Sequence, residues 1–248
     1  LFLLVRAQPL IIDGHRLLLL FLQDHTLQQH WQTMEQVFFH DTTNLLTGLI
    51  GASELMVKIA SPEQRGYAQN VHDLAMRLSK EVQIQKLLAH PDRRNYHLAA
   101  THTTCSSILA QTRELFSYHP LARDKALSFS SAPPEIKLWT DPYILVRVLS
   151  NMITNALEAS KPGEEVRVTA ELQGSHIVFS VWNRQYIAPY IAGRIFQRNF
   201  STKREAGHGL GTYSIKLFGE TILGGKVDFE TSEKDGTIFS MKLPRKND

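Results

Sequence analysis

The sequence lacks three features that would assign a protein quickly to a class. Only one cysteine, Cys105, occurs among its 248 residues, which excludes an internal disulfide framework and suits a reducing compartment. The longest apolar run, LLLLFL at 17–22, is far shorter than the roughly 20 residues that a helix needs to cross a bilayer. The chain opens on LFLLV without a signal-peptide layout, so we expect a cytoplasmic fragment of a longer protein, with any membrane anchor upstream.

Concentrated charge is missing as well. The formal net charge is +3, and there is no dense run of Lys and Arg and no platform of aromatic and basic residues, so nucleic acid is not an expected partner. Hydrophobic residues make up 43% of the chain, which excludes wholesale disorder, and we find neither internal repeats nor low-complexity tracts. The length is comfortable for two domains.

Two apolar stretches open the chain. Residues 1–23 read as two strands around a turn at 13–15, which predicts a β-hairpin. Two strands cannot hold a stable core alone. Together with the Asp-His-Thr at 24–26, the segment resembles the last strands and the Asp-x-Thr exit of a PAS-type sensor module. We therefore assign 1–26 to the C-terminal end of such a module.

Helical spacing follows. From about 27 to 60 and again over 63–89, apolar residues recur every three or four positions. Between the two stretches, Ser61 can cap a new helix with Pro62 at its first position. Two long helices joined by a tight turn form an antiparallel hairpin, and one hairpin buries only one stripe of each helix. Pairing two hairpins into a four-helix bundle covers both stripes, so we expect 27–92 to form a homodimer.

The remainder, 93–248, alternates helices and strands. This mixture predicts an α+β two-layer sandwich, and hence a multi-domain chain in which a helical hairpin precedes the sandwich. We predict helices near 103–118, 141–159 and 210–222, and strands near 125–130, 165–173, 176–183, 225–230 and 237–243.

Two stretches of this second part could bind a nucleotide. In VLSNMITNALEAS, Asn151 and Asn155 lie four residues apart, on one face of a helix. Carboxamide oxygens suit Mg²⁺, although the same spacing also fits a polar pair on an amphipathic helix. The glycine-rich GHGLG at 207–211 precedes a helical pattern, and glycines let the backbone approach a phosphate closely. The preceding RIFQRNFSTKREA contains Lys203 and could fold over a nucleotide as a lid.

The order and spacing of these pieces resemble the ATP-binding domain of sensor histidine kinases and their GHKL relatives, over roughly 103–243. The two asparagines match the N-box, Phe196 and Phe200 match the F-box, and GHGLG matches the G2 box. The resemblance implies ATP and Mg²⁺ as cofactors, with Mg²⁺ held by Asn155 together with Asn151, and phosphates held by Lys203 and the glycine-loop amides. The residues assigned to the nucleotide and its metal are Asn151, Asn155, Asn183, Lys203, Gly207, Gly209, Leu210 and Gly211.

One element departs from the family. Where relatives commonly have Asp-x-Gly-x-Gly to recognise adenine, this chain has Asn183 followed by RQYI, without either glycine. The side-chain oxygen of Asn183 can still accept a hydrogen bond, so the resemblance assigns adenine recognition to Asn183. A degenerate domain that binds no nucleotide remains an alternative.

The stretch FFHDTTN at 38–44 resembles the phospho-accepting H-box of the same kinases. A neutral imidazole is a nucleophile with a pKa near neutrality, which suits His40 for attack on the γ-phosphoryl group. Asp41 is close enough to orient the other ring N–H. Asn44 lies one helical turn further on the same face, and the resemblance gives it a role in dephosphorylating a response regulator.

These motifs predict ATP-dependent phosphorylation of His40 and transfer of the group to an aspartate on a separate response-regulator receiver domain, with 90–102 as a hinge. An ATPase of the gyrase or heat-shock kind is one alternative, but those relatives carry a glutamate where this chain has Asn151, which cannot act as a base. Glu158 follows Asn155 by three residues and faces elsewhere. A non-catalytic dimeric scaffold is the other alternative.

Overall fold

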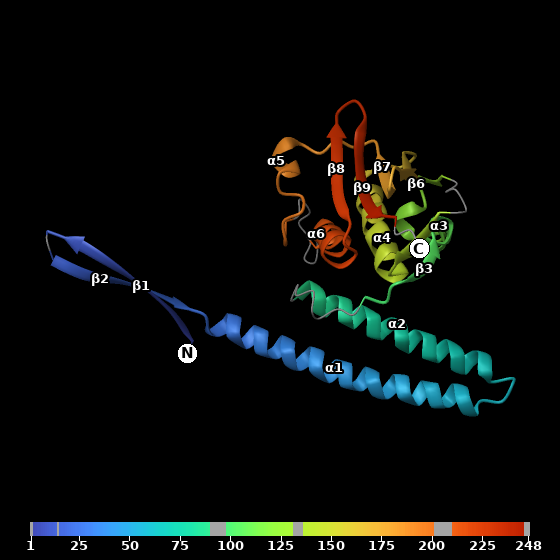
Figure 1. The fold of residues 1–248 in the computed structure, drawn as a ribbon, viewed down its shortest axis with the longest axis horizontal. Helices are drawn as coiled ribbons and strands as arrows, with labels where there is room; N and C mark the ends of the chain where they lie inside the picture. Colours follow the sequence, from blue (N-terminus) through green and yellow to red (C-terminus); the bar gives the residue numbers. More distant parts are fainter. Residues whose placement is uncertain (1, 14, 90–97, 131–135, 201–209, 246–248) are drawn as a thin grey trace. The chain divides into compact units, whose positions relative to one another are not determined.

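The structure is a computed structural model that describes residues 2–13, 15–89, 98–130, 136–200 and 210–245, apart from the side chains of residues 28 and 32. The chain divides into two compact units, Leu1–His90 and Pro91–Asp248, and each is described by itself (Figure 1). Within the described ranges, no helix is long and apolar enough to span a bilayer.

The first unit opens with the predicted antiparallel hairpin. β1 (Leu3–Ile12) pairs with β2 (His15–Asp24) in a register that sets Leu3 opposite Asp24. Every residue of both strands is exposed, so the hairpin has no core of its own among the described residues. Thr26 begins the next helix, and its backbone N–H donates to Asp24 Oδ1 at 2.8 Å. Hydrogen bonds from the Thr26 side chain and then from its backbone N–H lower the pKa of the Asp24 carboxyl group.

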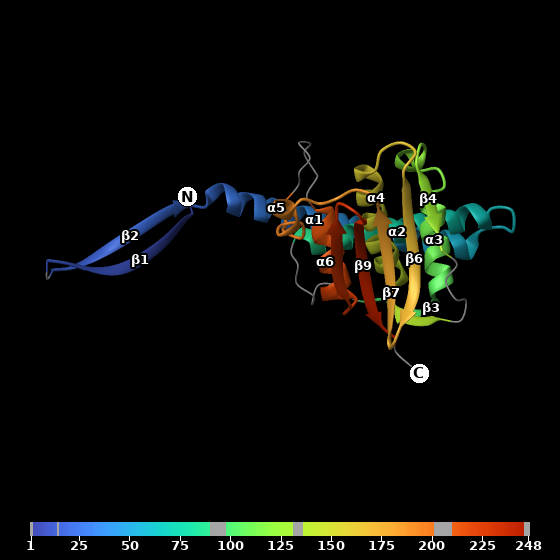
Figure 2. The ribbon, with the colours of Figure 1, turned by 90° about the horizontal axis from the view of Figure 1, so that it is seen from above.

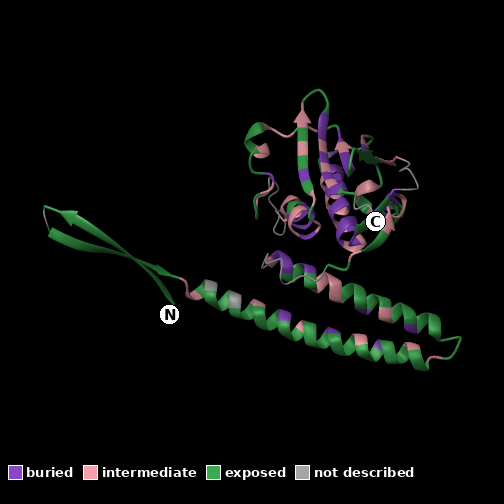
Figure 3. Cartoon of the chain, in the orientation of Figure 1, coloured by how far each residue is buried: buried purple, intermediate pink, exposed green. Residues whose placement is uncertain are grey.

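Two helices form the rest of this unit, α1 (Thr26–Ile59) and α2 (Arg65–Ala89). They pack as an antiparallel pair, and the Ser53 hydroxyl, which is almost fully buried, lies 3.0 Å from Nδ1 of His72 across the pair. Most of the surface of both helices is nevertheless exposed (Figure 3). The exposed apolar side chains include Leu45, Leu49, Met56, Ile59, Tyr67, Leu74 and Leu78.

A five-stranded mixed sheet organises the second unit. The strand order is β4-β6-β7-β9-β8, with β4 parallel to β6 and every other neighbouring pair antiparallel. Burial alternates along much of β6 and β9, whereas five consecutive residues of the central strand β7, residues 177–181, are buried. The strands are β4 (Ala126–Phe129), β6 (Glu165–Gln173), β7 (His176–Asn183), β8 (Lys226–Ser232) and β9 (Gly236–Pro244).

Helices form the second layer (Figure 2). The central helix, α4 (Pro142–Ala159), packs against β6 and β7 and contacts α3 (Cys105–Phe116) and α6 (Gly211–Lys216). A π-helical segment, η3 (Leu217–Ile222), continues α6. This arrangement confirms the predicted α+β sandwich.

The sequence explains why α4 begins where it does. Asp141 occupies the N-cap, and its Oδ1 accepts the backbone N–H groups of Tyr143 and Ile144 at 3.0 and 3.3 Å, while Pro142 takes the first helical position. Nine apolar side chains of α4 are buried, several with no exposed surface at all. The helix that carries both candidate asparagines is therefore fixed along its length.

Four smaller elements complete the described part of the unit, and none of them was predicted. β3 (Thr101–Thr104) pairs with β5 (Lys137–Thr140). Of the predicted hinge at 90–102, residues 90–97 lie outside the described residues, and the last two residues belong to β3. The remaining short helices are η2 (Pro120–Ala122) and α5 (Pro189–Ala192).

Candidate functional site

His40 lies on α1 with a side chain that is 73% exposed. Its Nδ1 is 3.0 Å from Oδ1 of Asp41. A carboxylate only accepts hydrogen bonds, so a neutral His40 ring bonded to Asp41 carries its proton on Nδ1 and its lone pair on Nε2. The structure places Asp41 beside His40, and the orienting role of Asp41 stays a prediction.

Asn44 lies against the same imidazole. Its Nδ2 is 3.4 Å from Nδ1 and 3.5 Å from Nε2 of His40, so the carboxamide sits beside the ring, one helical turn away. These two contacts are at the long limit for hydrogen bonds, and they leave the ring open to solvent. The three side chains of the predicted H-box are thus adjacent on one exposed face of the helix.

Asn155 of α4 is the second notable side chain. Its Nδ2 is buried and has no hydrogen-bond partner among the described residues. Buried amides are nearly always paired, so an unpaired one indicates a site for something else. Its Oδ1 faces Gly211, and a β-carbon at position 211 would lie 3.2 Å from that oxygen. A β-carbon there would have to displace the Asn155 side chain by a few tenths of an ångström.

These properties fit a nucleotide-bound Mg²⁺. An amide oxygen is a ligand that Mg²⁺ accepts, and the same carboxamide can donate an N–H to a phosphate oxygen. Within the described residues, no group of three or more His, Cys, Asp or Glu side chains could hold a metal.

Asn151 lies one turn before Asn155 and is connected differently. Its Nδ2 donates to the Ser214 hydroxyl at 2.8 Å, and that hydroxyl donates to the Gly211 carbonyl at 2.7 Å. The structure thus brings both predicted asparagines together with the end of the predicted glycine loop. Sequence reasoning missed Ser214, because no local pattern indicates a contact 63 residues away.

The rest of the predicted phosphate site is only partly described. Gly211 begins α6, and the Leu210 carbonyl accepts the Ser214 N–H at 2.8 Å. Lys203, Gly207 and Gly209 lie outside the described residues, so their roles stay predictions.

Asn183, the candidate for adenine, ends β7 and is 4% exposed. It pairs with Val166 of β6 and Thr237 of β9. Gly236 permits this close packing, since its φ is +81° and a β-carbon there would lie 2.3 Å from the Asn183 carbonyl oxygen. Asn183 is therefore a buried residue at the end of the central strand β7, where the atypical loop begins.

Two threonines hold that loop without the missing glycines. Thr237 Oγ1 donates to the Gln185 carbonyl at 2.7 Å and lies 2.7 Å from Thr231 Oγ1. Thr231 Oγ1 accepts the Ile187 N–H at 3.0 Å. Sequence reasoning missed both threonines, whose relation to the loop depends on strand register.

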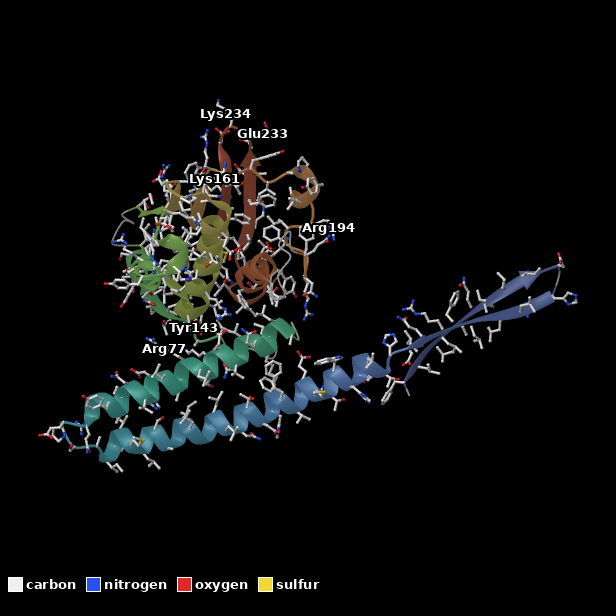
Figure 4. All side chains as sticks on the ribbon, turned by 180° about the vertical axis from the view of Figure 1, so that it is seen from behind. Arg77, Tyr143, Lys161, Arg194, Glu233 and Lys234 are labelled. Atoms are coloured by element: carbon white, nitrogen blue, oxygen red, sulfur yellow. The ribbon has the colours of Figure 1, made fainter. Side chains whose placement is uncertain are left out.

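The predicted F-box is anchored by aromatic contacts. The Phe196 ring lies 5.7 Å from Phe229 of β8 and 6.2 Å from Phe239 of β9, with Lys216 Nζ 5.0 Å from its centre. Arg194, at the edge of the unit (Figure 4), covers the Phe200 ring at 4.4 Å. The segment that leads to the glycine loop is therefore tied to the sheet.

Comparisons with known proteins agree with this geometry. Residues 140–247 match the family "Histidine kinase-, DNA gyrase B-, and HSP90-like ATPase". The sensor protein SrrB of Staphylococcus aureus is 30% identical over 135 residues, which is 52% of this chain and 23% of the relative. The chain thus spans under a quarter of the length of the curated relatives it matches.

Solved structures show the same fold. The nucleotide-free catalytic domain of histidine kinase ThkA is 25% identical, with a TM-score of 0.53 over 59% of this chain and 95% of that one. Full-length ShkA in complex with AMPPNP is 24% identical, with a TM-score of 0.56 over 86% of this chain and 45% of that one. Residues 140–247 therefore match histidine-kinase-type ATPase domains, and the likenesses to ThkA and ShkA show the same fold. The family match covers the asparagines but does not extend to His40.

Proposed function

We propose that this chain is the kinase part of a two-component sensor, which phosphorylates His40 from ATP and passes the group to an aspartate of a response regulator. The observation that carries the proposal is the state of the exposed imidazole. Asp41 Oδ1 lies 3.0 Å from Nδ1 of an imidazole that is 73% exposed, in a chain whose other unit has the fold of histidine-kinase ATPase domains.

The proposed reaction is a phosphoryl transfer from ATP to the His40 imidazole. Nε2 of His40 attacks the γ-phosphorus, the bond to the bridging oxygen breaks, and ADP leaves. The ring gains positive charge, which the Asp41 carboxylate stabilises through Nδ1–H. The product is a phosphoramidate, whose labile P–N bond allows transfer to a carboxylate of the regulator.

The nucleotide is the substrate of the second unit. Asn155 would hold Mg²⁺, which neutralises charge on the phosphates when it is bound. Asn183 would accept a hydrogen bond from adenine, and Lys203 with the glycine-loop amides would hold the phosphates. Asn44, beside the imidazole, would position water for dephosphorylating the regulator.

A homodimer is part of the proposal. Leu45 and Leu74 are 76% and 63% exposed on α1 and α2, and such apolar side chains in a soluble helical pair favour a four-helix bundle with a second copy. The PAS-like assignment of 1–26 remains part of the proposal as well, and the wholly exposed hairpin supports it.

Two alternatives make different predictions. An ATPase would need a base near the γ-phosphate, but the position before Asn155 on that helix face is Asn151, whose amide already donates to Ser214. A non-catalytic scaffold is favoured by a single feature, the loop without glycines after Asn183. The family match supports the kinase over the scaffold.

Incubation with ATP labelled at the γ-phosphate separates the three. The kinase predicts protein-bound label that is stable in base, labile in acid and absent in His40→Gln. The matched control is His30→Gln, another exposed histidine of α1, which should keep the label. Phosphate release without protein label would favour the ATPase, and absence of binding by calorimetry would favour the scaffold.

A further inference from the structure

The two asparagines of α4 differ in how they contact α6. Asn151 donates through Nδ2 to the Ser214 hydroxyl, and Ser214 is 3% exposed. A hydroxyl has one proton, and Ser214 gives it to the Gly211 carbonyl, so the two bonds form one directed chain. This chain joins the middle of α4 to the first residue of α6.

Both asparagines meet at Gly211. Asn151 reaches its carbonyl through Ser214, while the Asn155 carboxamide lies 3.2 to 3.9 Å from the position that a β-carbon would take at residue 211. If Gly211 moved away from α4, the hydrogen-bonded chain from Asn151 through Ser214 would break, and the space between Gly211 and Asn155 would widen. The position of Gly211 relative to Asn155 therefore depends on the Asn151–Ser214 bond.

The hydrogen-bond states of the two amides point to different roles. The Nδ2 of Asn151 is satisfied inside the protein, whereas the Nδ2 of Asn155 is buried without a partner among the described residues. A buried amide that lacks a partner gains most from a ligand, and one that is already paired would lose a bond by turning.

We propose that Asn151 and Ser214 are positioning residues, which hold Gly211 beside Asn155, the side chain already assigned to nucleotide-bound Mg²⁺. This inference rests on the proposed function for its ligand, but the hydrogen-bonded link itself does not. It also divides between two residues a role that the sequence assigned to both.

The first test measures affinity for a fluorescent ATP analogue with Mg²⁺ and with EDTA, on the full chain. If Asn151 is a positioning residue, Asn151→Ala and Ser214→Ala weaken both affinities by the same factor, about fivefold for one lost hydrogen bond. The double variant is then no weaker than Asn151→Ala alone. Asn155→Ala instead removes the difference between the Mg²⁺ and EDTA conditions.

Two further variants isolate the hydroxyl. Ser214→Thr keeps the donor and acceptor and should restore affinity. Ser180→Ala is the matched control, because Ser180 is also buried and bonds another hydroxyl, that of Ser240 at 3.1 Å, in the sheet. The proposal is overturned if Asn151→Ala loses only the Mg²⁺-dependent part of the affinity, or if the effects of Asn151→Ala and Ser214→Ala add.

The second test needs no nucleotide. Hydrogen exchange in the free protein should be about fivefold faster over Gly211–Lys216 in both Asn151→Ala and Ser214→Ala, and unchanged in Ser180→Ala. Unchanged exchange in the first two variants overturns the link. If the unaltered protein binds no nucleotide at all, the proposed function fails, and the exchange result still decides whether the link exists.

Discussion

The two units of the chain differ in where their apolar side chains lie. In the first, the hairpin strands and most of α1 and α2 are exposed, while in the second the central helix and strands are buried (Figure 3). Leu45 on α1 is 76% exposed, and Ile153 on α4 has no exposed surface. The second unit has a packed core, and the first leaves many of its apolar side chains exposed.

The chemistry divides in the same way. The proposed nucleophile lies on an exposed helix, with neighbours supplied by adjacent turns of that helix. The proposed nucleotide site is built from residues far apart in sequence, which only a packed core can hold together. Mutations beside His40 should therefore lower activity with little change in stability, whereas mutations in the core of the second unit should lower the free energy of unfolding.

The largest effect on activity is expected from Asp41→Ala. Loss of the group that orients His40 should slow phosphorylation by about 10²- to 10⁴-fold. The free energy of unfolding should stay within about 0.5 kcal/mol, because the Asp41 side chain is 65% exposed. Labelling rates and urea titration measure the two quantities. Asp73→Ala, at an exposed carboxylate of α2, is the control, and equal rates in both variants would contradict the role of Asp41.

The next prediction compares the two kinds of apolar residue directly. Ile153→Ala should lower the free energy of unfolding by about 2–5 kcal/mol, because it leaves a cavity in a packed core. Leu45→Ala should leave the unfolding of a dilute monomer nearly unchanged but weaken self-association. Urea titration and sedimentation at several concentrations measure both. The comparison breaks if Leu45→Ala destabilises the dilute protein as strongly as Ile153→Ala.

Gly236→Ala tests the packing that surrounds Asn183. Gly236 and Gly163 share a φ of +81°, but only Gly236 has a neighbour in the way, the Asn183 carbonyl oxygen. Gly163→Ala should cost about 1–2 kcal/mol from backbone strain alone. Gly236→Ala should cost more, because the backbone must also move. Thermal or urea unfolding of the two variants measures the difference in their free energies of unfolding. Equal losses would contradict the close packing between Gly236 and the Asn183 carbonyl.

The smallest effect concerns Cys105, which has no exposed surface. Burial raises the pKa of its thiol to about 11 from an ordinary 9.0, because the thiolate would lose its hydration. The stability that the buried neutral thiol contributes is complete below the ordinary thiol pKa of 9.0, and it is lost as pH rises through about 11. Ellman's reagent at pH 8 should label Cys105 in urea but hardly in the folded protein, and rapid labelling without urea would contradict this.

The sequence predicted elements that are long and periodic. The first hairpin, α1, α2, α4 and most strands of the sheet were predicted close to their observed bounds, because their apolar spacing is local. β3 and β5 were missed, because four-residue strands show no clear alternation of apolar residues. The two strands pair with each other although α3 and β4 separate them in the sequence. The helix predicted from 103 begins at Cys105, because Thr103 and Thr104 pair with β5.

The candidate site was predictable to the same extent. His40, Asp41 and Asn44 are neighbours on one helix, so their spacing alone indicates their contact. Ser214 and Thr237 act across the fold, and nothing near them in sequence indicates Asn151 or the loop at Gln185. Local chemistry is readable from the sequence, and contacts set by strand register and helix packing are not.

The most direct test of the account is to locate the phosphoryl group. After incubation of the chain with ATP and Mg²⁺, peptide mapping at alkaline pH should find a phosphoryl adduct on the peptide that contains His40, fragmented to that side chain. A modified residue elsewhere, or an unmodified protein that nevertheless binds ATP, would contradict the proposal that His40 is the acceptor.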